Sequence, residues 1–172
     1  MAPAPNPDHA WKLLSLINEW IRHSDTKAAV TLAFTGAMAT LLFNLARVIE
    51  NRTIPVDILV VAACILVATT GALCGLTLTP RINDKDADPQ AINRIFYVSI
   101  AANFRGRRPE YKDVVHTLSA DPAELIRDLA DQIHANATIA TTKARFAKWA
   151  IRAGLAAGVA IAAAAAVIEL SN

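Results

Sequence analysis

Three long apolar runs dominate the pattern of hydrophobic and polar positions. Residues 28–46 and 58–78 carry no charged side chain, and residues 153–170 carry one charge at their far end. A bilayer core about 30 Å thick is crossed by about 20 helical residues. The third run is shorter and rich in alanine, but Trp149 and the aliphatic stem of Arg152 can extend it by about a turn. We therefore predict three transmembrane helices.

The first run has an amphipathic stretch before it and no helix breaker between the two. Apolar side chains recur at three- and four-residue spacing over residues 11–21. Asn6 or Asp8 can cap this stretch, and Pro7 suits a first helical turn. We predict a single helix over residues 8–49.

The third run is preceded in the same way. Asp121, Pro122 and Glu124 form a strong helix-start signal, because they supply a cap, a proline in the first turn and an acid three residues after the cap. An apolar face continues over residues 125–137. We predict one helix over residues 122–170.

The segment between the second and third runs is polar and interrupted. Pro80 and residues 83–90 mark a solvated turn, residues 91–104 have the pattern of a short amphipathic helix, and residues 105–109 break it. Residues 110–118 then predict a second short helix.

The elements together predict an all-α fold, an integral membrane helical bundle with three transmembrane helices. Its first and last helices extend into a small cytoplasmic helical region. The expected segments are the cytoplasmic start of the first helix (1–27), the first span (28–49), a short external loop (50–57), the second span (58–78), the cytoplasmic helical region (79–148) and the third span (149–170).

The distribution of charge sets the expected orientation. Of the 17 Lys and Arg residues, 12 lie between Thr79 and Arg152 and three lie in residues 1–27. The positive-inside rule therefore predicts a multi-pass protein of the cell inner membrane, with its N-terminus and residues 79–148 in the cytoplasm. Hydrophobic residues make up 54% of the chain and the net charge is only +2. This balance does not suggest a nucleic-acid binder.

Signatures of catalysis and of metal binding are missing from the sequence. There is no phosphate-binding loop, no glycine-rich dinucleotide turn and no nucleophile elbow. The four histidines are scattered without metal-ligand spacing, and Cys64 and Cys74 lie ten residues apart on one predicted helix, too far for a disulfide. We expect no enzyme activity, no metal and no cofactor.

Two further signals each leave two interpretations open. The spacings Gly71-x-x-x-Gly75 and Gly154-x-x-x-Gly158 allow helices to approach closely, either within the chain or in a homo-oligomer. The basic residues 105–108 with Lys112 favour attraction to anionic membrane lipids, with a phosphate site as the alternative.

The most informative polar residues lie immediately before the first and third runs. Asn18, Arg22 and Asp25 share a helix face with Lys27 nearby, and Asn136 shares a face with Ile139, Ala140 and Lys143. One interpretation is anchoring at the membrane surface, with Asp25 an incidental partner of Arg22. In the other, the two polar sets bound a ligand pocket, where amides bind a base edge, cations bind a phosphate, and Trp20 or Tyr97 stacks on a ring.

These residues also carry a family resemblance. The stretches "WKLLSLINEWIRHSDTKAAVTLAFTGA", "IFYVSIAANF", "EYKDVV" and "LIRDLADQIHANATIATTKARFAKWA" resemble the transmembrane effectors of Pycsar, the pyrimidine cyclase system for antiphage resistance. The resemblance covers nearly the whole chain. The matching positions are Asn18, Trp20, Asp25 and Lys27 before the first run, and Asn136, Ile139 and Lys143 before the last.

The resemblance implies an antiphage defence effector. A companion cyclase would make cyclic UMP or cyclic CMP, and the effector would respond by impairing the inner membrane, which causes growth arrest or abortive infection. The ligand would bind in a pocket built from helices and would act by shifting the helix bundle between two states. Two alternatives remain: a membrane-disrupting protein that needs no ligand, and a structural subunit of a membrane complex.

Overall fold

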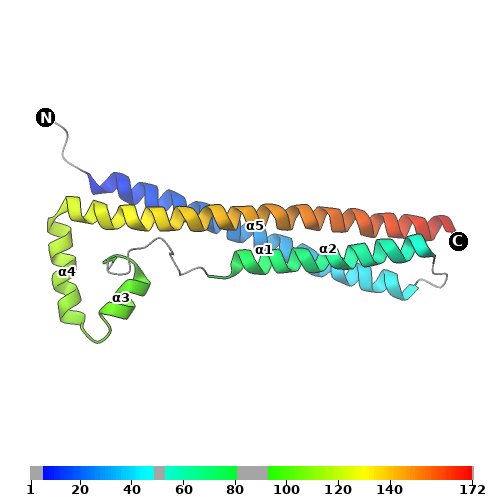
Figure 1. Ribbon diagram of the computed structural model, residues 1–172, viewed down its shortest axis with the longest axis horizontal. Coiled ribbons are helices and arrows are strands. Elements are labelled where there is room, and N and C mark those ends of the chain that lie inside the picture. The colour runs from blue at the N-terminus through cyan, green and yellow to red at the C-terminus, as the bar shows by residue number, and fades with distance from the viewer. Residues whose placement is uncertain (1–5, 49–52, 81–92, 172) are drawn as a thin grey trace. The chain divides into compact units, whose positions relative to one another are not determined.

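The computed structural model describes residues 6–48, 53–80 and 93–171, and these residues form five helices (Figure 1). They are α1 (Pro7–Val48), α2 (Ile54–Leu78), α3 (Tyr97–Asn103), α4 (Arg108–Ala120) and α5 (Pro122–Ser171). The all-α prediction is confirmed. The helices α1, α2 and α5 are each long and apolar enough to cross a membrane.

The cap signals explain where the two longest helices begin. The side chain of Asn6, not that of Asp8, caps α1, because its Oδ1 accepts a hydrogen bond of 2.9 Å from the Asp8 amide. Asp121 caps α5 by accepting hydrogen bonds from the amides of Ala123 and Glu124. Each capped helix then continues without interruption through the polar stretch and into its apolar run.

Two expected boundaries differ from the structure. The helix α2 begins at Ile54, four residues before the apolar run, with a proline in its first turn, so that residues 54–57 of the expected loop are helical. The helix expected over residues 91–104 is reduced to Tyr97–Asn103. The reason is a turn at Asn93, whose Oδ1 accepts hydrogen bonds from the amides of Ile95 and Phe96. The predicted turn at 83–90 lies outside the described residues.

The chain divides into two compact units. The first contains Met1–Ile21 and Pro80–Thr141, and the second contains Arg22–Thr79 and Thr142–Asn172. In the first unit, α3 and α4 are joined by a tight turn in which Gly106 adopts φ 76°, a backbone conformation that favours glycine. The rings of Phe104 and Tyr111 pack 5.1 Å apart across this turn. Leu118 and Leu129 are buried in this unit.

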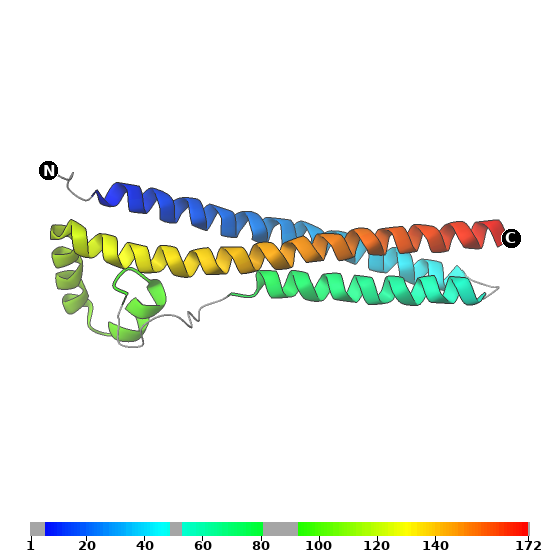
Figure 2. The same cartoon turned by 45° about the horizontal axis from the view of Figure 1, so that its top comes forward.

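The second unit contains the apolar parts of α1, α2 and α5, which run side by side (Figures 1 and 2). In this unit α1 and α5 run in the same direction, and α2 runs in the opposite direction. The buried positions repeat at intervals of seven, or of three and four, as in a coiled coil. They are Ser24, Ala28, Thr35 and Leu42 on α1; Val56, Ala63, Thr70, Cys74 and Thr77 on α2; and Lys143, Ala147, Ala150, Gly154, Ala157 and Ala164 on α5.

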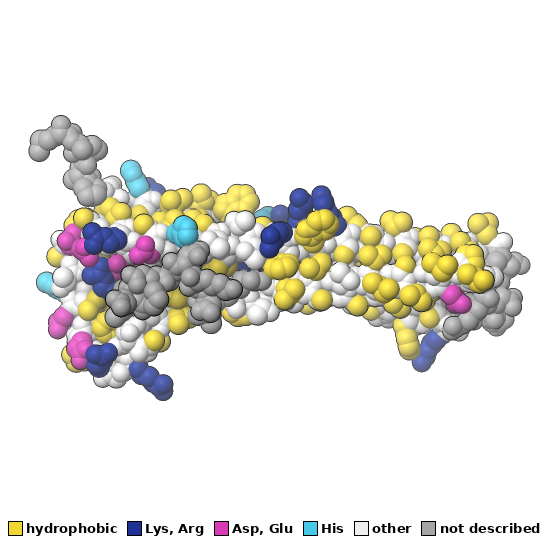
Figure 3. All heavy atoms as spheres, viewed as in Figure 1, with side chains coloured by type: hydrophobic (Ala, Val, Ile, Leu, Met, Phe, Trp, Pro, Cys, Tyr) yellow, Lys and Arg dark blue, Asp and Glu magenta, His cyan; other side chains and the backbone are white. Residues whose placement is uncertain are grey.

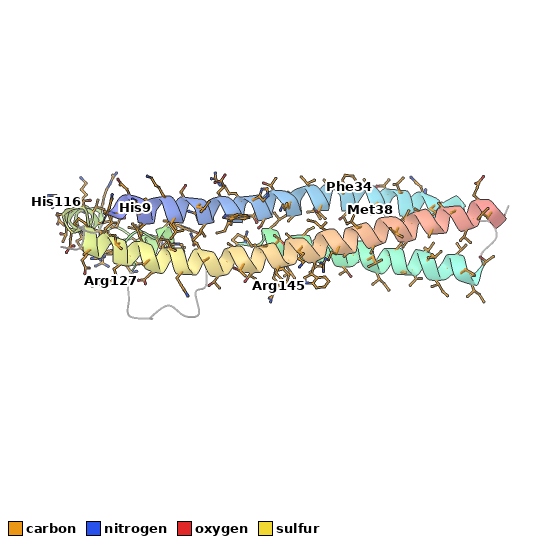
Figure 4. The ribbon with its side chains drawn as sticks, turned by 90° about the horizontal axis from the view of Figure 1, so that it is seen from above. His9, Phe34, Met38, His116, Arg127 and Arg145 are labelled. Atoms are coloured by element: carbon orange, nitrogen blue, oxygen red, sulfur yellow. The ribbon has the colours of Figure 1, made fainter. Side chains whose placement is uncertain are left out.

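Most side chains in this heptad seam are small, which allows the helices to approach closely. A β-carbon added to Gly154 would lie only 3.4 Å from Thr70 Cγ2 and 3.8 Å from Thr31 Cγ2. Met38 also faces this region, as Figure 4 shows, and its Sδ would lie 3.8 Å from a β-carbon on Gly158. The Gly154-x-x-x-Gly158 spacing therefore serves close packing within the chain.

The buried threonines of the seam have their hydroxyl groups satisfied. Thr35, Thr70 and Thr77 each donate to the carbonyl four residues earlier in the same helix, over 2.7–2.9 Å. None of these three hydroxyl groups is then left without a hydrogen-bond partner in the apolar part of the bundle. In the case of Thr70, the methyl group is the part that faces α5.

Candidate functional site

The polar residues before the apolar runs form two pairs that link α1 to α5. In the first unit, Asn136 Nδ2 donates a hydrogen bond of 2.8 Å to Asn18 Oδ1. In the second unit, Lys143 Nζ donates one of 2.6 Å to Asp25 Oδ1 and forms an ion pair with it. In both pairs the partners are 118 positions apart in sequence, and each residue of one pair is seven positions from its counterpart in the other.

Asp25 and Lys143 differ in their exposure. Only 7% of the Lys143 side chain is exposed, compared with 34% of the Asp25 side chain. Lys143 occupies the first buried position of the α5 seam, followed by Ala147 and Ala150. An ammonium group in such a place is stable only when it is paired, so Asp25 holds the charge of Lys143 in the seam.

The amide pair has a further partner. Gln132 Nε2 donates a hydrogen bond of 2.9 Å to Asn136 Oδ1, so that Asn136 accepts from its own helix and donates to α1. Asn18 and Asn136 are both half-buried. A chain of amides such as this offers hydrogen-bond donors and acceptors in alternation.

The remaining predicted ligand residues are on the surface. Arg22 and Lys27 are exposed on α1 of the second unit. Ile139, which belongs to the family pattern and not to the predicted ligand residues, is half-buried in the first unit. Trp20 and Tyr97, the two candidates for ring stacking, are 60% and 67% exposed in the first unit. The Tyr97 ring already contacts the Phe96 ring edge-on at 5.0 Å.

A second polar cluster in the first unit was not predicted from the sequence. Arg94 binds Asp128 through Nε (2.8 Å) and Nη2 (2.9 Å), and its Nη2 also contacts Glu124 at 2.9 Å. The Arg94 carbonyl accepts a hydrogen bond from the Tyr111 hydroxyl, and Asn93 donates to the Asp128 carbonyl. We call these residues the Arg94 clamp, because they fasten the chain before α3 to α4 and α5.

The carboxylates of the Arg94 clamp favour the charged form of Arg94. Hydrogen bonds to Asp128 and then to Glu124 raise the pKa of Arg94 above its ordinary value, although burial acts in the opposite direction. Because the pKa of Arg94 is raised, its contribution to stability is lost only as the pH rises through the folded value. Glu124 and Asp128, four positions apart on one helix face, were the available sequence signal, since two such acids favour a shared cation.

The structure also limits other chemistry among the described residues. No three His, Cys, Asp or Glu side chains within 6–48, 53–80 and 93–171 come together as ligands for a metal ion. The thiols of Cys64 and Cys74 are both free, the first exposed and the second buried.

The part of the chain that matches a known family contains both polar pairs. A family model, PycTM, the Pycsar effector protein domain, matches residues 9–169. The Pycsar effector protein PtPycTM of Propioniciclava tarda is 36% identical over 161 residues, which is 88% of this chain and 79% of that protein. No solved structure matches significantly.

Proposed function

The chain belongs to the Pycsar effector family, and from this premise we propose that it is an antiphage effector that responds to a cyclic pyrimidine mononucleotide, cUMP or cCMP, by impairing the cell inner membrane. The observation that carries the proposal is the pairing of Lys143 with Asp25. It puts a nearly enclosed cation on α5, ten positions before the apolar run that begins at residue 153, with a carboxylate as its charge partner.

The pairing provides a simple competition. A cyclic nucleotide carries one phosphodiester anion, and an anion of this kind can replace the Asp25 carboxylate at Lys143. When the anion binds, Asp25 loses its partner and α1 is no longer tied to α5 at that position. The ligand therefore has a different affinity for the paired and unpaired states, which is the condition for shifting the equilibrium between them.

The amide pair of the first unit supplies a separate set of proposed ligand groups. Asn18 and Asn136 bind the base edge in our proposal, and Trp20 offers a ring face for stacking. Arg22 and Lys27 belong to the proposed site as exposed cations that attract the phosphate. Each group is open to substitution by itself, so the phosphate and base contributions can be measured separately.

The proposed orientation in the membrane follows from the distribution of charge. The N-terminus and residues 79–148 face the cytoplasm in this proposal, because 12 of the 17 Lys and Arg residues lie between Thr79 and Arg152. Alkaline phosphatase fused after Asn172 should then be active in a bacterial inner membrane, and the same enzyme fused after Thr79 should be inactive. The reverse result would overturn the orientation.

Self-association is proposed through the outer face of α2. A β-carbon added to Gly71 or Gly75 meets no other side chain within 4 Å, so this small-residue face is open to a second copy. Gly71→Leu should then shift a homo-oligomer toward the monomer in sedimentation measurements in detergent.

A reconstituted system tests the ligand and the membrane effect together. Purified protein in vesicles that contain a fluorescent dye should release the dye when cUMP or cCMP is added, and cyclic AMP should have no effect. Lys143→Met should abolish the response, whereas Asp25→Asn should lower the nucleotide concentration that is needed, because it removes the competing charge. Lys12→Met, an exposed position on α1, is the matched control.

Three outcomes would contradict the proposal. Release without nucleotide would favour the ligand-independent membrane-disrupting protein. Stable vesicles together with a co-purifying protein partner would favour the structural subunit. An unchanged response in Lys143→Met would remove Lys143 from the ligand site.

A further inference from the structure

The outer face of α5 carries a group of cations that the polar pairs do not use. Arg145, Lys148 and Arg152 are exposed, and so is Trp149, which is 53% exposed. Their spacing of three, four and seven positions puts them on one side of the helix, away from the buried positions of the seam. Figure 4 shows Arg145 on the side of α5 that faces away from α1. We call these four residues the α5 belt.

Within the described residues, no carboxylate lies within ion-pair distance of the belt cations. No Asp or Glu occurs between Asp131 and Glu169 in the sequence. Among the described residues, none of the three belt cations forms an ion pair within 4.0 Å. Two of them lie near aromatic rings instead, with Arg152 5.1 Å from the Trp149 ring centroid and Arg145 5.8 Å from that of Phe146.

The belt lies at one end of the apolar parts of all three helices, where those of α1 and α5 begin and that of α2 ends. Because Lys143 pairs with Asp25 and the two helices are parallel, Arg145 is level with Lys27, directly before the apolar run of α1. Gly154 packs on Thr70 of the antiparallel α2. Phe146 lies eight positions before Gly154, and Leu78 lies eight positions after Thr70. Because the two helices are antiparallel, Phe146 is level with Leu78, the last residue of α2.

The surface changes abruptly at this level. In Figure 3, Lys and Arg side chains gather over the middle of α5, and the surface of the helix beyond them is largely hydrophobic. Leu155 and Val159 continue the belt's side of the helix and are both strongly exposed. On one side of α5, the cations and the indole ring of the belt are therefore followed by exposed aliphatic side chains.

From this arrangement we propose that the α5 belt is a docking surface for anionic phospholipids of the surrounding membrane. The phosphate headgroups bind Arg145, Lys148 and Arg152, the Trp149 ring lies at the level of the headgroups, and the acyl chains cover Leu155 and Val159. A free anion would not cover the exposed aliphatic part of this face, because it has no acyl chain. The assignment concerns a position and a ligand outside the proposed nucleotide site.

Quenching of Trp149 fluorescence by brominated lipid measures the preference directly. With Trp11→Phe and Trp20→Phe, Trp149 is the remaining tryptophan of the chain's three. The protein is placed in vesicles of phosphatidylcholine and phosphatidylglycerol of one fixed composition, in which an equal mole fraction of either lipid is brominated. Each cation near an anionic surface favours the anionic lipid by about five-fold, so brominated phosphatidylglycerol should quench at least about five-fold more effectively.

Variants separate charge from folding. Changing Arg145, Lys148 and Arg152 together to Gln should bring the two lipids to equal quenching, and Arg145→Lys with Arg152→Lys should keep the preference. Arg47→Gln is the matched control, because Arg47 is also an exposed cation stacked on an aromatic ring, 4.3 Å from the Phe43 centroid. It should leave Trp149 quenching unchanged.

Two conditions identify the source of the phosphate. About 1 M potassium chloride, where the screening length is about 3 Å, should abolish the preference. Excess glycerol 1-phosphate should not, because this soluble headgroup lacks acyl chains. Equal quenching in the unsubstituted belt, a preference that survives the triple substitution, or full competition by glycerol 1-phosphate would each overturn the lipid assignment. The experiment contains no nucleotide, so its result is independent of the proposed function.

Discussion

Lys143 and Asp25 form the ion pair that ties α5 to α1 in the second unit, and the lysine is the more deeply buried partner of the two. The two single substitutions should therefore differ in cost. Asp25→Leu leaves an enclosed ammonium group without a partner and should destabilise the fold by about 3–5 kcal/mol. Lys143→Met leaves a carboxylate that can still reach water and should cost about 1–2 kcal/mol.

Unfolding by added SDS in uncharged detergent micelles, followed by circular dichroism, measures these costs. The double variant Asp25→Leu with Lys143→Met should recover most of the loss, because no unpaired charge remains. Lys12→Met, at an exposed position of α1, serves as the control. Equal losses of stability in the two single variants would show that the deeper burial of Lys143 does not determine the cost of breaking the pair.

The amide pair should show a measurable coupling of its own. Asn18→Ala and Asn136→Ala each remove one side of a hydrogen bond between half-buried groups. In a double-mutant cycle, we expect a coupling energy of about 0.5–1.5 kcal/mol. Asn136→Ala should be the more costly single change, because it also removes the acceptor of Gln132. Additive effects of the two substitutions would mean that the pair contributes nothing.

The Arg94 clamp should control the local stability of the first unit. Arg94→Met leaves the buried Asp128 carboxylate without its cation and should cost about 3 kcal/mol. Hydrogen exchange of the backbone amides of residues 95–104 should accelerate, because the clamp holds the start of this segment. Arg107→Met is the control, since Arg107 pairs with Glu110 where both side chains are more than half exposed, and it should change stability by less than about 1 kcal/mol. Equal acceleration in the two variants would contradict the clamp.

The two glycine spacings should respond differently to a larger side chain. Gly154→Leu puts four carbon atoms where even a β-carbon approaches Thr70 and Thr31, and should cost about 1–3 kcal/mol or more. A β-carbon added to Gly71 has nothing within 4 Å, so with Gly71→Leu we expect thermal unfolding of the monomer hardly to change. A large loss of monomer stability in Gly71→Leu would mean that this face is packed.

The sequence predicts the long helices well and the side-chain partners poorly. The caps at Asn6 and Asp121 and the absence of helix breakers are local features of the sequence. The helices α1 and α5 could therefore be predicted from the sequence alone. The helix expected over 91–104 was too long, because the Asn93 side chain both caps a turn and binds the Asp128 carbonyl of α5, a contact that the sequence does not show. Tertiary contacts of this kind override periodicity.

The candidate site was predicted as two faces but not as two pairs. Asn18 with Asp25, and Asn136 with Lys143, were recognised as polar sets at the start of apolar runs. Their spacing of seven residues in each helix was the signal for direct pairing, because a heptad repeat puts both members on the same seam. The exposure of Arg22 and Lys27 follows from the same repeat, since neither lies seven positions from a seam residue of α1 such as Ala28.

Most side chains of the seam are small and alike, so their packing alone would fix the register of the helices only weakly. A displacement of one helix by seven residues, about 10.5 Å, would bring one alanine or threonine to the place of another and leave much of the contact unchanged. Thr35, Thr70 and Thr77 would not resist, because their hydroxyl groups bind their own helices. The ion pair between Asp25 and Lys143 would then fix the register of α1 against α5 in this unit. A ligand that breaks the pair would remove one of the few contacts there that specify the register.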